Sequence, residues 1–307
     1  MSGRSDIKVG FCVSYDWHLL RYSLPLVYPY SDSICLSIDI HRRGWSGSQY
    51  PFDEEAFASF LSSADPDRKI RLYEADFSDP KLSPMENDNR QRRMMSDHMG
   101  RGGWHIQVDS DEYFLDFKEF VAYLRKFEVS MKARSGPLNI CCPWISIFKH
   151  LPKGYLVIDN SAGVWETTPF ATMNPEYLYA RKNSHFNIIS NHFVVHETWA
   201  RSKAQLRQKL DSWGHVNDFD SQSYMNFWDA LDEHNYRYAI NFHPIKSEVW
   251  HRLKYVEAGS VSELISKLAK GDPFKLRMGN MYLTNSRNWN RIVSLMKRIG
   301  TSSEVNK

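Results

Sequence analysis

The feature that limits the fold most strongly is a regular alternation of two kinds of segment in the first 128 residues. Apolar runs typical of buried strands occupy residues 7–15, 33–39, 69–76 and 104–109. Segments that predict helices follow them, at residues 17–29, 53–64, 86–99 and 117–127. This alternation predicts an α/β fold, with a mainly parallel central sheet and helices on both of its faces.

The second half of the chain has a less regular pattern. Strands are expected at residues 138–148 and 186–196, and residues 236–242 are compatible with a third. Helices are expected from about residue 198 to 213 and at residues 224–234, 261–269 and 287–299. The sequence contains no internal repeat and no convincing domain boundary, and the stretch at 271–274 is at most a hinge.

Composition narrows the class of protein. Hydrophobic residues make up 42% of the chain, which indicates a globular protein. The formal net charge of +3 is too small to indicate a nucleic-acid-binding protein, but it is compatible with an anionic small-molecule ligand. The four cysteines lack zinc-ligand spacing, and the sequence has neither a signal-peptide pattern nor a membrane-spanning run. We therefore expect a cytoplasmic protein with reduced cysteines.

An acidic motif, Asp109-Ser110-Asp111-Glu112, directly follows the apolar strand at residues 104–109. Asp109 and Asp111 are two positions apart, so an extended strand would place both carboxylates on one side. Mg²⁺ and Mn²⁺ prefer oxygen ligands and often bridge carboxylates to a diphosphate. Asp16 and Asp39 also follow predicted strands, and ligands of such sheets bind at the carboxyl ends of strands. A solvated acidic turn that caps the next helix is the alternative.

Four segments of the first half together resemble the family-2 type of GT-A glycosyltransferases. They are VSYDWHLLRYSLPLV, ICLSID, NDNRQRRMM and HIQVDSDEYF. The resemblance covers about 120 residues well and the rest in patches. It implies a Rossmann-like GT-A fold and the use of a nucleotide-sugar donor. The implied domains are a catalytic domain at 1–270, divided into a nucleotide-sugar-binding half at 1–128 and an acceptor-binding half at 129–270, and a C-terminal helical extension at 271–307.

The resemblance also implies roles for individual residues. Contacts to the nucleotide sugar are implied for Ser14, Asp16, Asp39, Asp109 and for Arg90 or Arg93, the last two at the diphosphate. Metal ligands are implied at Asp109 and Asp111, with Mn²⁺ or Mg²⁺ as the ion. A histidine at the end of a late strand completes the metal site in several such enzymes. His196 fits that position, and His251 is the alternative.

A transferase that inverts the anomeric carbon needs a general base near the acceptor hydroxyl. The candidates are Glu166, Glu197 and Asp218, and the sequence does not decide among them. Aromatic residues make up 14% of the chain, and flat rings commonly pack against sugar faces. Trp144, Trp165 and Trp199 are therefore candidates for stacking on the acceptor, although each of them also suits a core position.

These observations predict a metal-dependent transferase that moves a sugar from a nucleotide donor, with UDP as a guess, to a glycan acceptor. The acceptor could be linked to a lipid, because residues 287–299 combine apolar and basic side chains in a pattern compatible with an anionic membrane surface. A helix packed on the domain is the favoured interpretation of this tail. The other functions considered are a carbohydrate-binding protein with a degenerate site and a nucleotidyltransferase. A nucleotidyltransferase would need a glycine-rich phosphate loop near the N-terminus, and this sequence has no such loop there.

Overall fold

A computed structural model describes residues 4–131, 137–163, 165–212, 219–271, 274 and 276–277. The first half of the chain folds as predicted. Strands β1 (Ile7–Cys12), β2 (Ser33–Asp39), β3 (Ile70–Ala75) and β4 (Trp104–Asp109) are parallel, in the order β3-β2-β1-β4. The helices between and after them are α1 (Leu20–Val27), α2 (Glu54–Ala64), α3 (Pro84–His98) and α4 (Phe117–Met131).

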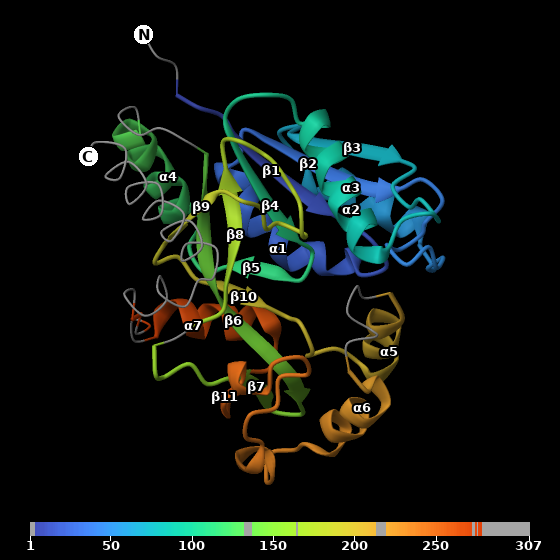
Figure 1. Ribbon diagram of the computed structural model, residues 1–307, viewed down its shortest axis with the longest axis vertical. Coiled ribbons are helices and arrows are strands. Elements are labelled where there is room, and N and C mark those ends of the chain that lie inside the picture. Colours follow the sequence, from blue (N-terminus) through green and yellow to red (C-terminus); the bar gives the residue numbers. More distant parts are fainter. Residues whose placement is uncertain are drawn as a thin grey trace, which may run out of the picture.

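Residues 112–257 extend the same sheet with further strands, the first of which still belongs to the first half of the chain (Figure 1). They are β5 (Glu112–Phe114), β6 (Leu138–Leu151), β7 (Gly154–Ile158), β8 (Thr167–Thr172), β9 (Phe186–Ile189), β10 (Val194–His196) and β11 (Leu253–Glu257). The helices here are α5 (Lys203–Ser212), α6 (Ser221–Ala230) and α7 (Val261–Lys270). Short 3-10 turns occupy Trp17–Leu19, Tyr28–Tyr30, Tyr236–Tyr238 and Ser247–Val249.

The sheet is mixed, so the prediction of a mainly parallel sheet is wrong. Among the strand pairs of the described residues, five are parallel and five are antiparallel. The two residues between β6 and β7 are too few for a crossover, and a connection of that length forces an antiparallel pair. The α/β alternation that produces parallel strands stops after α4.

Two strand predictions in the second half are also wrong. Residues 186–196 form two strands, because β9 pairs with Leu138–Cys141 of β6 and β10 pairs with Trp144–Ser146. Pro143 lies in the gap between these two ladders and has no N–H to donate. Residues 236–242 contain a 3-10 turn in place of a strand.

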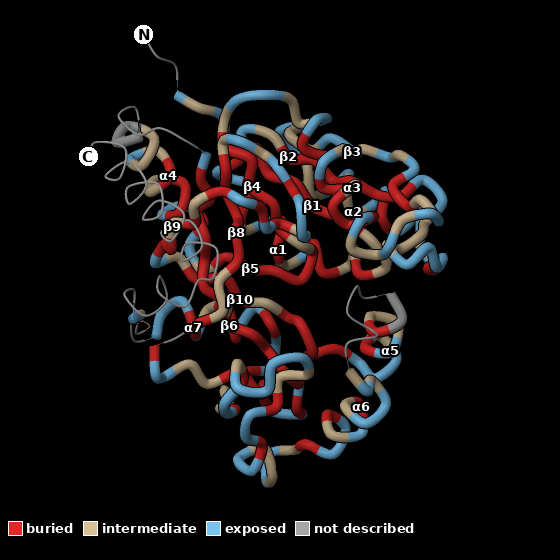
Figure 2. The backbone as a smooth tube through the Cα atoms, in the orientation of Figure 1, coloured by how far each residue is buried: buried red, intermediate tan, exposed pale blue. Residues whose placement is uncertain are grey.

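The central strands of the sheet are deeply buried (Figure 2), whereas β3 at its edge has no fully buried residue. Every residue of β1 is buried, as is all of β2 except its first residue. A central parallel strand covered on both faces has this character. Every residue of β4 is buried as well except Asp109 at its carboxyl end, which is half-buried.

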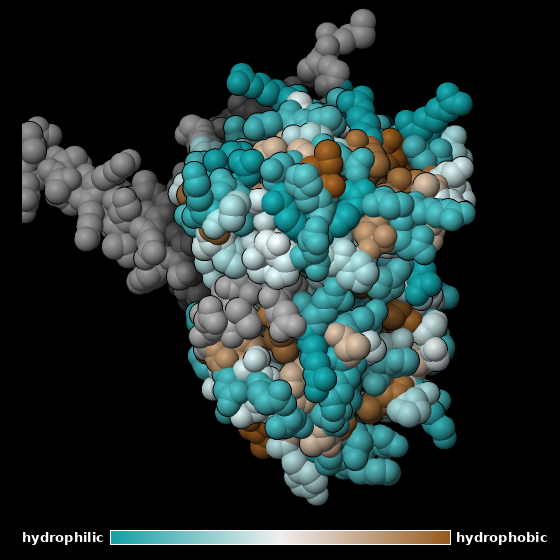
Figure 3. Space-filling view, turned by 90° about the vertical axis from the view of Figure 1, so that its right-hand side faces the viewer, coloured by the Kyte–Doolittle hydropathy of each residue, from teal (hydrophilic) through white to brown (hydrophobic). Residues whose placement is uncertain are grey.

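The surface around α5 and α6 is mainly polar. Figure 3 shows the side of the molecule that carries α5 and α6, where hydrophilic side chains cover most of the surface and apolar ones form small separate groups. In the part of the chain that the structure describes, no helix has the length and apolar character needed to cross a membrane. The predicted helix at 287–299 lies outside the described residues.

Candidate active site

A large cavity opens at the carboxyl ends of the parallel strands, where a sheet of this topology is expected to bind a ligand. Its volume is about 760 Å³, within the range of about 300–1,000 Å³ that is usual for small-molecule sites. Ser14 follows β1, Asp39 ends β2 and Asp109 ends β4, and all three line the cavity. Glu166 and His196 line it as well, so both halves of the chain form its wall.

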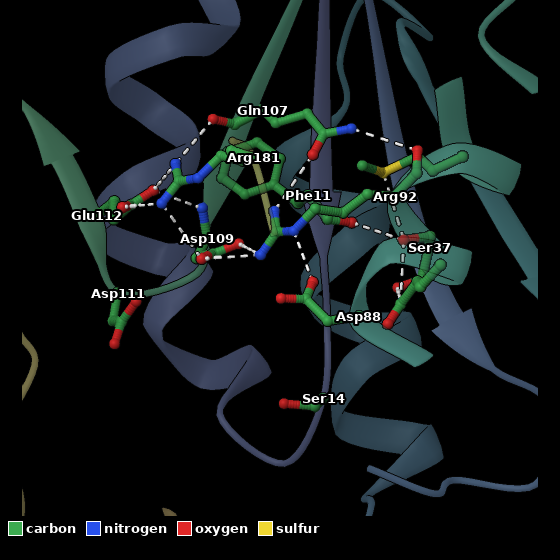
Figure 4. Close-up of polar contacts among 12 residues, drawn as sticks. Phe11, Ser14, Ser37, Asp88, Arg92, Gln107, Asp109, Asp111, Glu112 and Arg181 are labelled. Atoms are coloured by element: carbon green, nitrogen blue, oxygen red, sulfur yellow. Dashed lines mark hydrogen bonds and ion pairs between the residues drawn. The ribbon is translucent and has the colours of Figure 1, made fainter. Parts of the chain in front are cut away.

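Asp109 lies between two buried guanidinium groups (Figure 4). Nη2 of Arg92 donates to both of its oxygens, at 3.0 and 3.2 Å, and Nη2 of Arg181 lies 3.5 Å from Oδ2. Arg92 also donates to Asp88 at 2.6 Å, and Arg181 binds both oxygens of Glu112 at 2.5 and 2.7 Å. Burial alone would raise the pKa of Asp109, but the two arginines outweigh it and hold that pKa below its ordinary value.

Helix α3 supplies Arg92. The helix begins with a capping box in which Ser83 and Glu86 each accept a hydrogen bond from the other's backbone N–H. Asp88 and Arg92 are four residues apart and therefore lie on one face of the helix, and both are buried. The two arginines predicted to approach the diphosphate point elsewhere: Arg90 donates to the carbonyl of Asp76 and Arg93 is exposed. Neither lines the cavity.

A second group of charges surrounds Asp111. Its Oδ2 accepts from Nη2 of Arg201 at 2.5 Å and from Nζ of Lys209 at 3.2 Å, and it lies 3.8 Å from Nε2 of His196. Arg201 also pairs with Asp16 at 3.0 Å, and Asp16 accepts from the hydroxyl of Ser14 at 3.1 Å. Burial would raise the pKa of Asp111, but Lys209 and Arg201 outweigh it and hold that pKa far below its ordinary value.

The two carboxylates of the acidic motif have different partners and do not face one ion as an extended strand would place them. Strand β4 ends at Asp109, and Ser110 and Asp111 form a turn before β5. The alternation of side chains that holds along a strand does not continue through that turn. In Figure 4 the side chain of Asp111 points away from the network around Asp109.

Asp39 lines the cavity, but the protein itself uses both of its oxygens. They accept hydrogen bonds from the backbone N–H groups of His41, Arg43, Phe77 and Ser78 and from the guanidinium of Arg43. These bonds outweigh burial and lower the pKa of Asp39. Asp39 therefore joins the loops that follow β2 and β3, and it stands on the cavity wall between them.

The three candidate acceptor tryptophans all line the cavity. Trp144 is half-buried, donates to Glu112 at 3.0 Å and packs against the imidazole of His196, with ring centroids 4.5 Å apart. Trp165 and Trp199 are almost fully buried, so most of their surface contributes to the core. The geometry makes Trp144 the most accessible of the three.

The structure separates the three candidate general bases. Glu166 lines the cavity, and its Oε2 accepts from Nε1 of Trp250 at 2.6 Å. Burial raises the pKa of Glu166. Glu197 is buried outside the cavity lining and accepts from the hydroxyl of Tyr113 at 2.5 Å. Asp218 lies outside the described residues.

The two candidate metal histidines also differ in place. His196 lines the cavity beside Asp111, whereas His251 is exposed, hydrogen-bonds to Asn241 and does not line the cavity. Burial lowers the pKa of His196 to about 4, so the imidazole is neutral at pH 7. Only His196 stands where it could share an ion with the acidic motif.

The ligand set that the site offers to Mn²⁺ or Mg²⁺ is small. No set of three or more His, Cys, Asp or Glu side chains that could hold an ion gathers among the described residues. Asp111 and His196 nevertheless offer an ionised carboxylate and a neutral imidazole 3.8 Å apart on the cavity wall. Such ions commonly take one or two protein ligands and complete their coordination with substrate phosphate and water. The pair fits as the protein's share of such a site.

Comparison of the sequence with models of known protein families and with curated proteins gives no match.

The sequence pattern did not point to most of the charged partners of the acidic motif. These are Arg92, Arg181 and Lys209, together with Asp88. The spacing of Asp88 and Arg92 on one helix face could have revealed that pair. Arg181, Arg201 and Lys209 reach the motif from segments more than 65 residues away, and no local pattern reports such a contact.

Proposed function

We propose that this protein is a metal-dependent glycosyltransferase of the GT-A type, which moves a sugar from a nucleoside diphosphate donor to a glycan acceptor. One observation carries the proposal. Asp109, at the end of β4, and Asp111, in the turn that follows it, line a large cavity at the carboxyl ends of the parallel strands, in a sheet with the order β3-β2-β1-β4. A nucleotide is the usual ligand of that edge in such a sheet.

The two sides of the cavity suggest where each substrate binds. We place the nucleoside diphosphate against Ser14, Asp39 and Asp109, which follow or end β1, β2 and β4. We place the acceptor against Trp144 and Glu166, which belong to the second half of the chain. The sugar to be transferred would lie between them, so that donor and acceptor meet inside one cavity.

The charges of the site support a divalent cation. The network around Asp109 contains three carboxylates (Asp88, Asp109 and Glu112) and two guanidinium groups, a formal charge of −1. The network around Asp111 contains two carboxylates and two cations, a formal charge of zero. Together the two networks therefore supply no net positive charge to a diphosphate. When bound by Asp111 and His196, Mn²⁺ or Mg²⁺ would supply the positive charge that stabilises the departing diphosphate.

Glu166 is the residue we propose as the general base. Its carboxylate would take the proton of the acceptor hydroxyl while the acceptor oxygen bonds to the anomeric carbon and the bond from that carbon to the diphosphate breaks. Burial raises its pKa, which makes the carboxylate a stronger base than an exposed glutamate. The hydrogen bond from Trp250 fixes the orientation of the carboxylate. This mechanism inverts the anomeric configuration.

Calorimetry tests the proposal. Binding of UDP, GDP, CDP and dTDP should be measured with and without Mn²⁺ on the wild type, on Asp111→Asn and on Asp229→Asn. Asp229 is a matched control, because it also loses a carboxylate ion pair but is exposed and outside the cavity. We expect one nucleotide to bind with Mn²⁺, to lose at least about tenfold in affinity with Asp111→Asn and to bind the control normally.

The same titrations decide between the competing functions. If none of the four nucleotides binds under any metal condition, the transferase proposal is wrong, and glycan binding without a nucleotide would favour a carbohydrate-binding protein. If a nucleotide binds, release of nucleoside diphosphate from the matching sugar donor should be measured next. Glu166→Gln should then lower kcat by about 10²–10⁴ with little effect on nucleotide affinity.

A further inference from the structure

Exposed apolar side chains concentrate on one loop, at residues 236–252. Among the described residues eight large hydrophobic side chains are exposed, and three of them lie within this loop. They are Tyr238, Ile240 and Ile245, which are 84%, 51% and 38% exposed. The loop lies at the lower end of the molecule in Figure 1, where the chain runs from α6 to β11. Single exposed apolar residues are ordinary, but a group of them marks a surface that contacts another molecule or a membrane.

The fold holds these side chains outward. The loop turns back on itself, because the backbone N–H of Phe242 donates to the carbonyl of Trp250 at 3.1 Å. Both residues are buried in the core beneath the loop, together with Ala239. The chain therefore buries an alanine and exposes the larger side chains of Tyr238 and Ile240 on either side of it. Such an arrangement forgoes the free energy of burying them and keeps their apolar surface available for contact.

The charge of the loop indicates the kind of surface that it contacts. Residues 236–252 contain three cations, Arg237, Lys246 and Arg252, against one carboxylate, Glu248, and all four are exposed. A segment that binds an anionic membrane has this composition. Its aromatic and aliphatic groups enter the headgroup region, while its cations are attracted to the negative surface of the bilayer. The net positive charge of the loop complements such a surface.

We propose that the loop at 236–252 docks the protein on an anionic membrane through its exposed apolar and basic side chains. The consequence for the acceptor rests on the proposed function. Ile245 and Lys246 are exposed and also line the cavity, and Trp250 donates to Glu166 on the cavity wall. A bilayer on this loop would therefore lie beside the acceptor side of the cavity. The acceptor class that fits is a lipid-linked glycan, whose sugar enters the cavity while its lipid stays in the bilayer.

Flotation with lipid vesicles tests the proposal on the whole chain. The vesicles contain phosphatidylcholine alone, or phosphatidylcholine and phosphatidylglycerol in equal parts. We expect the wild type to bind the anionic vesicles and to bind the neutral ones much more weakly. Tyr238→Ser combined with Ile240→Ser should weaken binding at least about tenfold, because both apolar contacts are lost. Lys246→Gln and Arg252→Gln should each weaken binding about fivefold, and only on the anionic vesicles.

The matched control is Ile40→Ser combined with Leu72→Ser. Both side chains are exposed, at 53% and 42%, but Ile40 follows β2 and Leu72 belongs to β3, at the other end of the sheet from β11. This control should bind vesicles as the wild type does. The segment at 287–299 keeps its sequence in every variant, so a loss confined to the loop variants reports on the loop.

Two results would overturn the proposal. One is a wild type that does not bind the anionic vesicles. The other is a set of loop variants that bind them as well as the control does, with circular dichroism showing that all are folded. Self-association of the wild type in sedimentation velocity, lost in the variant of Tyr238 and Ile240 and without vesicle binding, would assign the loop to a second copy of the chain instead. Titrations with UDP, GDP, CDP and dTDP judge the proposed function separately, because neither Tyr238 nor Ile240 lines the cavity.

Discussion

Removal of Arg181 should destabilise the fold far more than removal of an exposed arginine. Arg181 makes two hydrogen bonds to Glu112, one to the carbonyl of Gln107 and an ion pair with Asp109, and its side chain is 6% exposed. Arg181→Met leaves the buried carboxylate of Glu112 without its cation. Loss of one partner of a buried ion pair costs about 3–5 kcal/mol. We expect a loss of that size in the free energy of unfolding.

A double variant tests the reason for the loss. Arg181→Met combined with Glu112→Gln removes both charges, and the Gln carbonyl can still accept a hydrogen bond. The double variant should lose only about 1–3 kcal/mol, for the hydrogen bonds to Gln107 and Asp109 that Arg181 no longer makes. Glu112→Gln alone should be clearly destabilising as well, because it removes the closer of the two carboxylates that pair with the guanidinium of Arg181.

Urea unfolding followed by tryptophan fluorescence measures these values, with Arg237→Met as the control. Arg237 is exposed, and its loss should change the free energy of unfolding by less than about 0.5 kcal/mol. The double-mutant cycle then gives the coupling of Arg181 and Glu112 directly. Additive losses, or a cost below about 1 kcal/mol for Arg181→Met, would refute the argument that this pair is buried and mutually dependent.

Two further predictions concern the second half of the chain. Gly154→Ala should cost about 1–3 kcal/mol in urea unfolding, because a Cβ there would overlap the carbonyl of Val256 and lie 2.8 Å from the ring of Tyr255; a neutral result would mean that β11 can move away. Glu166→Gln should stabilise the protein at pH 8, because burial raises the pKa of Glu166 and ionising it in the folded state therefore costs free energy. The stability that a raised carboxyl pKa contributes is complete below the ordinary pKa of about 4.3 and is lost as the pH rises through the folded-state value. Unfolding measured from pH 4 to 8 should therefore show the advantage of Glu166→Gln only in the upper part of the range, and a less stable variant at pH 8 would contradict the assignment.

The sequence predicted strands β1 to β4 and the helices between them well. The strands at 33–39 and 104–109 match β2 and β4, and the helix at 53–64 begins one residue late as α2 (Glu54–Ala64). The reason is physical: a strand buried on both faces is a continuous apolar run, and a helix on the sheet repeats its apolar residues every three or four positions. Both patterns are local.

The strands that follow β4 in the chain could not be predicted with the same success. Strands β5 and β10 have only three residues each and pair with one another across about 80 residues of chain, so their stability depends on distant partners. The same applies to the site. The ends of the predicted parallel strands placed Asp16, Asp39 and Asp109 in one cavity correctly, but the buried cations reach it through tertiary contacts that the spacing of residues in the sequence does not reveal.

Strand β6 has a consequence for how the protein can move. Its 14 residues form one continuous strand. This strand pairs with β8 and β9 at one end, with β10 in the middle and with β7 at the other end. Two of its neighbours, β8 and β10, also pair with β4 and β5 of the first half, so a hinge between the halves would have to break those pairs, and the ion pair of Arg181 with Glu112 would resist it as well. The distance between the two sides of the cavity, against which we place the nucleotide and the acceptor, is therefore set before any ligand binds. Reactants brought together in such a pre-organised frame need no domain closure to align, and catalysis would gain its orientation from the scaffold itself.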